Sequence, residues 1–124
     1  MLDTSFFIDL RSRRDPGAVA FWAQVGSLSA ATSPIVLYEL WVGSGMSREE
    51  EAFYRACMAF LDEAPLRNSA AITAGIWLRL VGDRSEPLLR DALIGATAVE
   101  RSERVLTRNG WDFSQFPDFR VETY

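Results

Sequence analysis

Short apolar runs alternate along the chain with longer segments that carry helix signals. We expect strands in the short runs, at residues 30–32, 64–66, 104–107 and 120–124, and helices between them. Residues 1–10 are apolar except at a few positions, and we expect a short buried strand there that runs into a helical turn. Strands that alternate with helices predict an α/β fold, in which helices cover both faces of a parallel sheet. Sites in such sheets lie at the carboxyl ends of the strands.

Five helices are predicted from residues that favour helix ends. Two of them begin with a capping side chain followed by a proline, and a third begins with a capping box. The predicted helices and their starting signals are residues 16–25 after Asp15-Pro16, 35–42 after Ser33-Pro34, 48–61 after Ser47 with Glu50, 69–81 after Asn68 or Ser69, and 87–100 from Pro87.

Three acidic residues lie in apolar surroundings. Asp3 follows the first apolar residues, Glu39 interrupts the apolar residues 35–42, and Asp91 precedes a segment rich in alanine and isoleucine. The helix around Glu39 is apolar on every side, so we expect it to be buried. A buried carboxylate is costly unless it is paired, hydrogen-bonded or bound to a metal ion, and one cation neutralises several of them. The three acids therefore form a candidate metal site.

The alternative for each acid is a structural role, as a helix cap or as the partner of an arginine. Asp91 is expected in a first helical turn, where an acid is favourable without any ligand. Glu39 has no arginine within one helical turn along the sequence. Both interpretations stay open for all three acids.

A second polar group follows the apolar residues 105–106. A strand there brings Thr107, Asn109 and Asp112 to its carboxyl end, where the other acids are expected. The alternative is an ordinary exit from a strand, with Asn109-Gly110 forming a turn.

Two residue types are absent, and their absence excludes several classes of enzyme. The 124 residues contain no histidine, and all 13 basic residues are arginine. Histidine dyads, Schiff bases and phosphate-loop lysines are therefore excluded, and the single cysteine cannot form a zinc site. Carboxylates, hydroxyls and arginines are left, and carboxylates favour hard cations such as Mg²⁺ or Mn²⁺. Because the net charge is −4, any contact with nucleic acid has to be local.

No part of the sequence predicts insertion into a membrane. No apolar run approaches the roughly 20 residues that cross a bilayer, and Asp3 and Asp9 interrupt the apolar start. We expect a cytoplasmic protein that folds as a single domain over residues 1–124. Only two residues precede Asp3, so the first strand is short or the true start lies upstream.

Four segments, in order along the chain, resemble the motifs of the PIN domain family. They are residues 1–10 with Asp3-Thr4-Ser5, residues 32–43 with Glu39-Leu40, residues 91–98 with Asp91 leading a helix, and residues 106–113 with Thr107-Arg108-Asn109 and Asp112-Phe113. Each motif alone is weak, but together they span nearly the whole chain. The length and the final residues 116–121 look most like VapC-type toxins of toxin–antitoxin pairs.

The resemblance implies a three-layer α/β/α fold with a four- or five-stranded parallel sheet. It also implies Mg²⁺- or Mn²⁺-dependent endonucleolytic cleavage of RNA, a homodimer, and a cognate antitoxin that blocks the site. Asp3, Glu39 and Asp91 match the three family acids, with Asp3 and Asp91 as the most direct metal ligands. The fourth position departs from the pattern, because many members have an acid in place of Asn109. Either Asp112 takes that catalytic and metal-binding role or Asn109 binds through its amide oxygen, so that one or two metal ions remain possible.

The neighbours of these acids are expected to support them. Thr4 and Ser5 would hold Asp3 by hydrogen bonds, and Thr107 and Asn109 would support the fourth position. Cleavage by an activated water would leave a 5′-phosphate and a 3′-hydroxyl.

Three arginines follow the first acid closely in the sequence. Arg11, Arg13 and Arg14 are candidates to hold the RNA backbone, and the alternative is a solvated helix end. Trp111 is the one tryptophan beside the expected site, and the other three are expected to pack in the core or in a dimer.

Two rival functions remain. A non-catalytic PIN-like module that binds RNA or protein is favoured by Asn109 at the fourth position. An aspartate-based phosphatase needs a paired Asp-x-Asp and a lysine, whereas Thr4-Ser5 follows Asp3 and lysine is absent.

Overall fold

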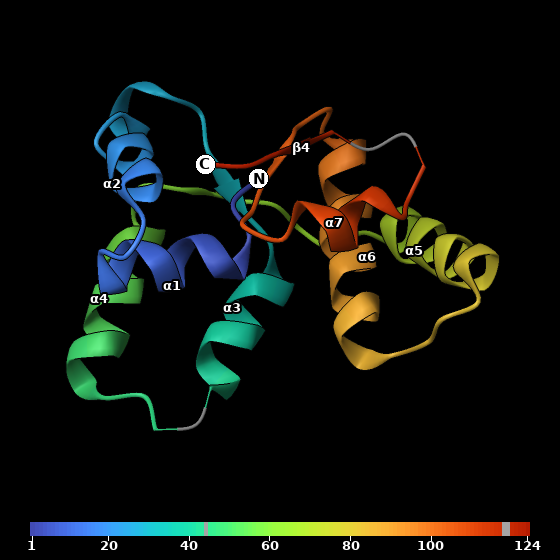
Figure 1. Ribbon diagram of the computed structural model, residues 1–124, viewed down its shortest axis with the longest axis horizontal. Coiled ribbons are helices and arrows are strands. Elements are labelled where there is room, and N and C mark those ends of the chain that lie inside the picture. Colours follow the sequence, from blue (N-terminus) through green and yellow to red (C-terminus); the bar gives the residue numbers. More distant parts are fainter. Residues whose placement is uncertain (44, 118–119) are drawn as a thin grey trace.

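The computed structural model describes residues 1–43, 45–117 and 120–124, which form a helix-rich α/β fold (Figure 1). The α-helices are α1 Thr4–Ser12, α2 Pro16–Trp22, α3 Pro34–Val42, α4 Arg48–Met58, α5 Asn68–Val81, α6 Glu86–Glu100 and α7 Gly110–Ser114. The strands are β1 Ala31–Thr32, β2 Asp62–Glu63, β3 Val105–Leu106 and β4 Val121–Glu122, and a 3₁₀ turn covers Val25–Ser27. In the described part, no helix is long and apolar enough to cross a membrane.

The strands form two parallel pairs, β1 with β2 and β3 with β4. Residues 1–3 run between the pairs. The Leu2 amide donates to the Ala31 carbonyl at 2.8 Å, and the Leu106 amide donates to the Met1 carbonyl at 2.9 Å. These bonds place the first residues between β1 and β3, so that Asp3 leaves the middle of the strand layer. The four- or five-stranded sheet stays a prediction, because the described strands form two separate two-stranded sheets.

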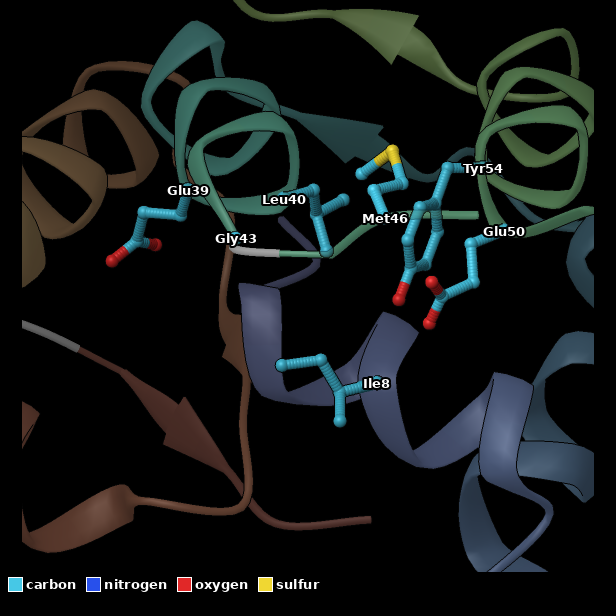
Figure 2. A pocket seen from close by; sticks show the side chains of 7 residues that line it. All are labelled: Ile8, Glu39, Leu40, Gly43, Met46, Glu50 and Tyr54. Atoms are coloured by element: carbon cyan, nitrogen blue, oxygen red, sulfur yellow. The ribbon is translucent and has the colours of Figure 1, made fainter. Parts of the chain in front are cut away.

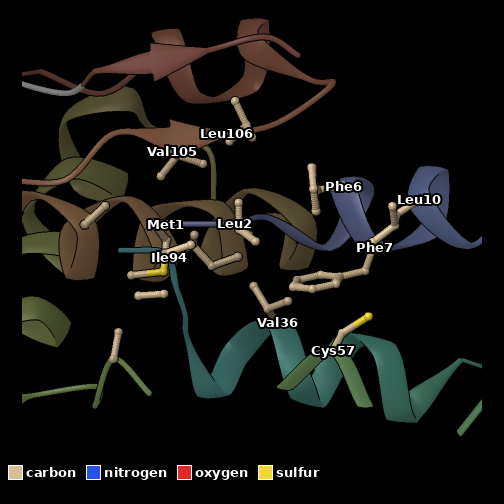
Figure 3. Packing of buried hydrophobic residues seen from close by; sticks show 14 of the residues in the cluster. Met1, Leu2, Phe6, Phe7, Leu10, Val36, Cys57, Ile94, Val105 and Leu106 are labelled. Atoms are coloured by element: carbon tan, nitrogen blue, oxygen red, sulfur yellow. The ribbon is translucent and has the colours of Figure 1, made fainter. Parts of the chain in front are cut away.

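Helices lie on both sides of the strands. In Figure 1, α1 to α4 lie on one side, while α5 and α6 lie on the other. The larger apolar cluster joins α1, α3 and α4 to the strands, and Figure 3 shows Leu2 between Val105 of β3 and Val36 of α3. A second cluster, which includes Trp77, Leu88 and Phe116, joins α5 to α6. The larger cluster includes Ala31 of β1 and Leu106 of β3, so it holds the strands against α1 and α3.

Three predicted helix starts are confirmed by their capping bonds. The Asp15 side chain accepts from two amides of the first turn of α2, and Ser33 Oγ accepts from the Val36 amide at 3.3 Å. Ser47 and Glu50 form the predicted capping box of α4. Such short-range bonds satisfy the free amides of a helix start, so they depend on local sequence alone.

Four expectations about these elements are wrong. The helix α3 is not buried on every side, since Tyr38 is 53% exposed and Val42 is 60% exposed. The strand expected at residues 64–66 lies two residues earlier, where Asp62 pairs with Ala31 of β1. Asp91 lies in the second turn of α6, because this helix begins at Glu86. The Asn109-Gly110 turn is the start of α7.

Candidate active site

Asp3 lies where the first extended residues become a helix. Its amide donates to the Leu106 carbonyl of β3 at 3.1 Å, and α1 begins at the next residue. Asp3 is the N-cap residue of α1, yet its side chain makes no capping bond, which leaves the carboxylate available for other partners. Asp3 is buried, so the free-energy cost of burying its charged carboxylate depends on the groups that hydrogen-bond to it.

Two buried hydroxyls hold Asp3. Ser5 Oγ donates to Asp3 Oδ2 at 2.9 Å, and Thr107 Oγ1 donates to the same oxygen at 2.7 Å. The two hydroxyl oxygens are 3.2 Å apart. Among the described residues, none donates a comparable hydrogen bond to Asp3 Oδ1, so this oxygen is free of the two hydroxyls that hold Oδ2.

Glu39 approaches the same region from α3 and is held by a different kind of partner. Arg90 Nε of α6 donates to Glu39 Oε1 at 2.6 Å, and the Thr4 hydroxyl donates to Glu39 Oε2. Thr4 was expected to hold Asp3. It lies at the first position of α1, from which its hydroxyl reaches Glu39 instead.

Asp91 has the most perturbed carboxyl group of the site. Its pKa is raised from 3.8 to about 7, first by burial and then by the negative charges of Asp3, Asp112 and Glu39, while the positive charge of Arg90 opposes them. Among the described residues, no hydrogen bond or ion pair holds the Asp91 carboxylate. Desolvation and like charges both disfavour ionisation, so a cation near this carboxylate would relieve both effects.

Asp112 and Asn109 are the two candidates for the fourth position, and they lie at the start of α7. Asp112 lies in the first turn of α7 and acts on Asp91 through its negative charge. Asn109 is the N-cap residue of the same helix but makes no side-chain capping bond. It is exposed, and its backbone amide donates to Thr107 Oγ1 at 3.0 Å. Thr107 therefore links Asp3 to Asn109, which precedes the helix that carries Asp112.

The four acids are near one another but do not converge on one point. In the described residues, no three acidic or cysteine side chains lie close enough to hold a metal ion as they stand. Mutual repulsion is a sufficient physical reason for this spacing. By chemistry the set fits a hard divalent cation, because every donor is a carboxylate oxygen. Burial, and after it the charges of the other acids, raise the pKa of Asp91, and a nearby cation would oppose both effects. Asp3, Asp91 and Asp112 are the members without an ion pair in the described part.

Residues 1–118 match the family model of the PIN domain. The chain belongs to the PIN domain family. No curated protein shows significant similarity to the sequence. Similar solved structures include the DNA-bound VapBC complex of Salmonella typhimurium, with a TM-score of 0.82 and 26% identity over 99% of this chain and 96% of that chain.

Two other VapBC structures show the likeness of this PIN domain over nearly all of its length. VapBC2 of Rickettsia felis, bound to a promoter DNA fragment, has a TM-score of 0.83 at 19% identity, covering 100% of this chain and 97% of that chain. VapBC-5 of Mycobacterium tuberculosis has a TM-score of 0.61 at 27% identity, covering 98% of this chain and 94% of that chain. Together these neighbours support the resemblance to VapC-type PIN domains.

A pocket of about 140 Å³ in this PIN domain is lined by one of the four candidate acids, Glu39. Figure 2 shows it between α1, α3 and α4, with Glu39 at one end, Tyr54 and Glu50 at the other, and Ile8 between them. Glu50 pairs with Arg11 at 2.8 Å. Arg11 is therefore committed to a protein partner, whereas Arg13 and Arg14 are exposed.

A second buried carboxylate, Asp9, had no role in the sequence analysis. Arg108 Nη1 donates to Asp9 Oδ1 at 2.5 Å, and the Tyr124 hydroxyl donates to Asp9 Oδ2 at 2.7 Å. The Arg108 amide also donates to Ser5 Oγ at 3.1 Å, which connects this group to the hydroxyls around Asp3. The interruption of the apolar residues 1–10 by Asp9 was the available signal. Arg90 carried no such signal, because it lies 51 positions from Glu39.

Proposed function

We propose that this PIN domain is a Mg²⁺- or Mn²⁺-dependent endoribonuclease and the toxin of a type II toxin–antitoxin pair. One observation carries the proposal. The buried carboxyl of Asp91 on α6 feels the negative charges of Asp3, Glu39 and Asp112, which come from three other segments of the chain. Structural ion pairs do not need this concentration of one charge, but a site for a hard cation and a phosphodiester does.

The residues of the chain would divide the work of this site. Asp3 would offer Oδ1 to the ion, with Oδ2 held by Ser5 and Thr107. Asp91 would supply the charge that is least compensated, and Asp112 or Glu39 would orient the water that attacks. A divalent ion bound here would lower the pKa of a bound water molecule and would place positive charge beside the phosphate.

The RNA would be held by arginines around the site. Arg13 and Arg14 are exposed at the end of α1, and Arg11 would first have to leave Glu50. Arg108 is half-exposed while its other face is fixed by Asp9, so it is a further candidate for a phosphate contact. In-line attack by water would give a 5′-phosphate and a 3′-hydroxyl.

The partner proposals follow from the structural neighbours. Their names describe toxin–antitoxin complexes, so we propose a cognate antitoxin that covers the site, a homodimer of this chain, and action in the cytoplasm.

The continuous parallel sheet expected for the family would form through the bonds that residues 1–3 make to both strand pairs.

The decisive experiment compares cleavage of a structured RNA by the wild type and by Asp3→Asn, each with Mn²⁺ and with EDTA. We expect Asp3→Asn to lower cleavage by at least about 1,000-fold, because the site loses a ligand charge and keeps its shape. The control is Asp62→Asn, which removes an exposed aspartate outside the site and should keep full activity. Activity that persists in EDTA and in Asp3→Asn contradicts the proposal.

The alternative is a PIN-like module that binds RNA or protein without cleaving it. It is favoured by Asn109 at the fourth position and by the open spacing of the acids in the described residues. Calorimetry with Mn²⁺ separates the two functions. A binding module need not take up the ion, whereas the nuclease must bind it and lose it in Asp3→Asn.

A further inference from the structure

Arg90 is a positively charged group inside a site that otherwise gathers negative charge. It extends from α6, one residue before Asp91, and contacts two acids at once. Its Nε donates to Glu39 Oε1 at 2.6 Å, and its Nη1 donates to Glu86 Oε1 at 2.8 Å. The side chains of Arg90 and Glu39 are 24% and 18% exposed, so solvent screens their ion pair only in part.

Glu39 is fully engaged by these contacts. One of its oxygens accepts from Arg90, and the other accepts from the Thr4 hydroxyl. A guanidinium bound to a carboxylate neutralises it and repels any second cation that approaches. Glu39 therefore differs from Asp3, Asp91 and Asp112, which have no ion pair in the described part of the chain.

Glu86 is a second ion-pair partner of Arg90. It lies one helical turn before Arg90 on α6, and its side chain is 72% exposed. An i,i+4 pair of this kind keeps the guanidinium near the site after the contact to Glu39 breaks.

We propose that Arg90 is an exchangeable counter-ion of Glu39, which competes with the divalent cation and moves toward Glu86 when the cation binds. This inference rests on the proposed metal site and concerns a positioning residue. It makes metal affinity depend on a residue that is not a ligand. It also agrees with the pairing of Glu39, whose side chain is 18% exposed, with Arg90 at 2.6 Å.

The test measures Mn²⁺ affinity by calorimetry in the wild type, in Arg90→Gln and in Arg90→Lys. We expect Arg90→Gln to bind Mn²⁺ on the order of tenfold more tightly, because removing an opposing charge beside a carboxylate has an effect of this size. Arg90→Lys keeps the charge without the two-pronged contact and should lie between them. The matched control is Arg55→Gln, which removes an arginine from the i,i+4 pair with Glu51 on α4 and should leave the affinity unchanged.

A double-mutant cycle makes the role of Glu86 measurable. Glu86→Gln should weaken Mn²⁺ binding about two- to threefold in the wild type, because Arg90 loses its second partner, and should have no effect in Arg90→Gln. An effect of equal size in both backgrounds contradicts the exchange. Thermal unfolding of each variant in EDTA shows that it is folded.

The outcomes separate this inference from the nuclease proposal. If the wild type and Arg90→Gln bind Mn²⁺ equally, and Asp3→Asn abolishes binding in both, the metal site stands and the counter-ion role is refuted. Weaker binding in Arg90→Gln also refutes it, because Arg90 would then orient Glu39 for the metal. If no variant binds Mn²⁺, the proposed metal site fails and the counter-ion role fails with it.

Discussion

Asp3 and Asp91 are both aspartates of the candidate site, but the surroundings of their carboxyl groups differ. Asp3 is buried at the end of the first extended segment, where two neutral hydroxyls donate to one of its oxygens. Asp91 lies on α6, has no hydrogen bond or ion pair in the described part of the chain, and has a pKa raised to about 7 by burial and by the other acids. Hydrogen bonds thus compensate the burial of Asp3, whereas Asp91 has only the charge of the neighbouring Arg90 to oppose its burial and the other acids, as far as the described residues show.

The difference assigns the two acids different properties within one site. Asp3 has a fixed position, since its donors come from α1 and from the end of β3. Asp91 is the acid whose pKa is raised by burial and by the negative charges of the other three acids. Changes around Asp3 should therefore act on geometry, and changes at Asp91 should act on charge.

The largest expected effect comes from removing the charge of Asp91. Its pKa is higher in the folded protein than in the unfolded chain, so the folded state retains a proton that the unfolded chain releases between pH 4 and pH 7. Stability should fall as the pH rises through this range and stay low above it. The shift from 3.8 to about 7 corresponds to at most about 4 kcal/mol, and screening at a partly exposed group reduces this to about 2 kcal/mol.

Urea unfolding in EDTA at several pH values measures this effect. Asp91→Asn should be more stable than the wild type by about 2 kcal/mol at pH 8 and nearly equal to it at pH 4. Asp62→Asn, at an exposed aspartate outside the site, should follow the wild type. If the unfolding free energies of the wild type and of Asp91→Asn depend on pH in the same way, the pKa of Asp91 is not raised in the folded protein.

Addition of Mn²⁺ sharpens the same comparison. The ion should stabilise the wild type more at pH 8 than at pH 5, because binding requires ionised carboxylates. Asp91→Asn should lose most of this stabilisation, which thermal unfolding with and without the ion would measure. Equal stabilisation of both proteins would place the ion elsewhere.

The next effect comes from the hydroxyls of Asp3. Thr107→Val keeps the shape of a fully buried side chain but removes the donor to Asp3 and the acceptor for the Asn109 amide. We expect a loss of about 2 kcal/mol in unfolding free energy, because a buried carboxylate loses one of its two donors. The control is Thr97→Val, at a buried threonine that donates to a helix carbonyl at 2.8 Å, with an expected loss below about 1 kcal/mol. Equal losses would mean that Asp3 does not depend on Thr107.

The smallest effect is expected at Thr4. Thr4→Val removes the hydroxyl donor of Glu39 but leaves the ion pair with Arg90, and the residue is half-buried. We expect a loss of about 1 kcal/mol or less, with recovery in Thr4→Ser, which restores the hydroxyl. If Thr4→Val lowers the unfolding free energy more than Thr107→Val does, the hydroxyl bond to Glu39 contributes more to stability than the hydroxyl bond to Asp3, contrary to this prediction.

Features that depend on neighbouring residues were predictable from the sequence. The caps at Asp15, Ser33 and Ser47 formed as expected because each bond spans at most three residues. The acids in apolar surroundings were also recognisable. Partners from distant elements were not, since no local pattern links Glu39 to Arg90 or Asp9 to Arg108.

The errors have physical causes of the same kind. Apolar residues all around α3 predicted burial, yet the fold leaves Tyr38 and Val42 exposed because α3 packs through Val36 and Leu40. Asp62 and Glu63 form β2 although both are exposed acids, since pairing with β1 outweighs their low strand preference. Burial and pairing of this kind are set by the whole fold.

The paired hydroxyl donors on Asp3 have a thermodynamic consequence. A free aspartate samples several rotamers, and a ligand that binds it must halt that motion at an entropic cost. Ser5 and Thr107 have already restricted the Asp3 side chain during folding, so its orientation is set before any ligand arrives.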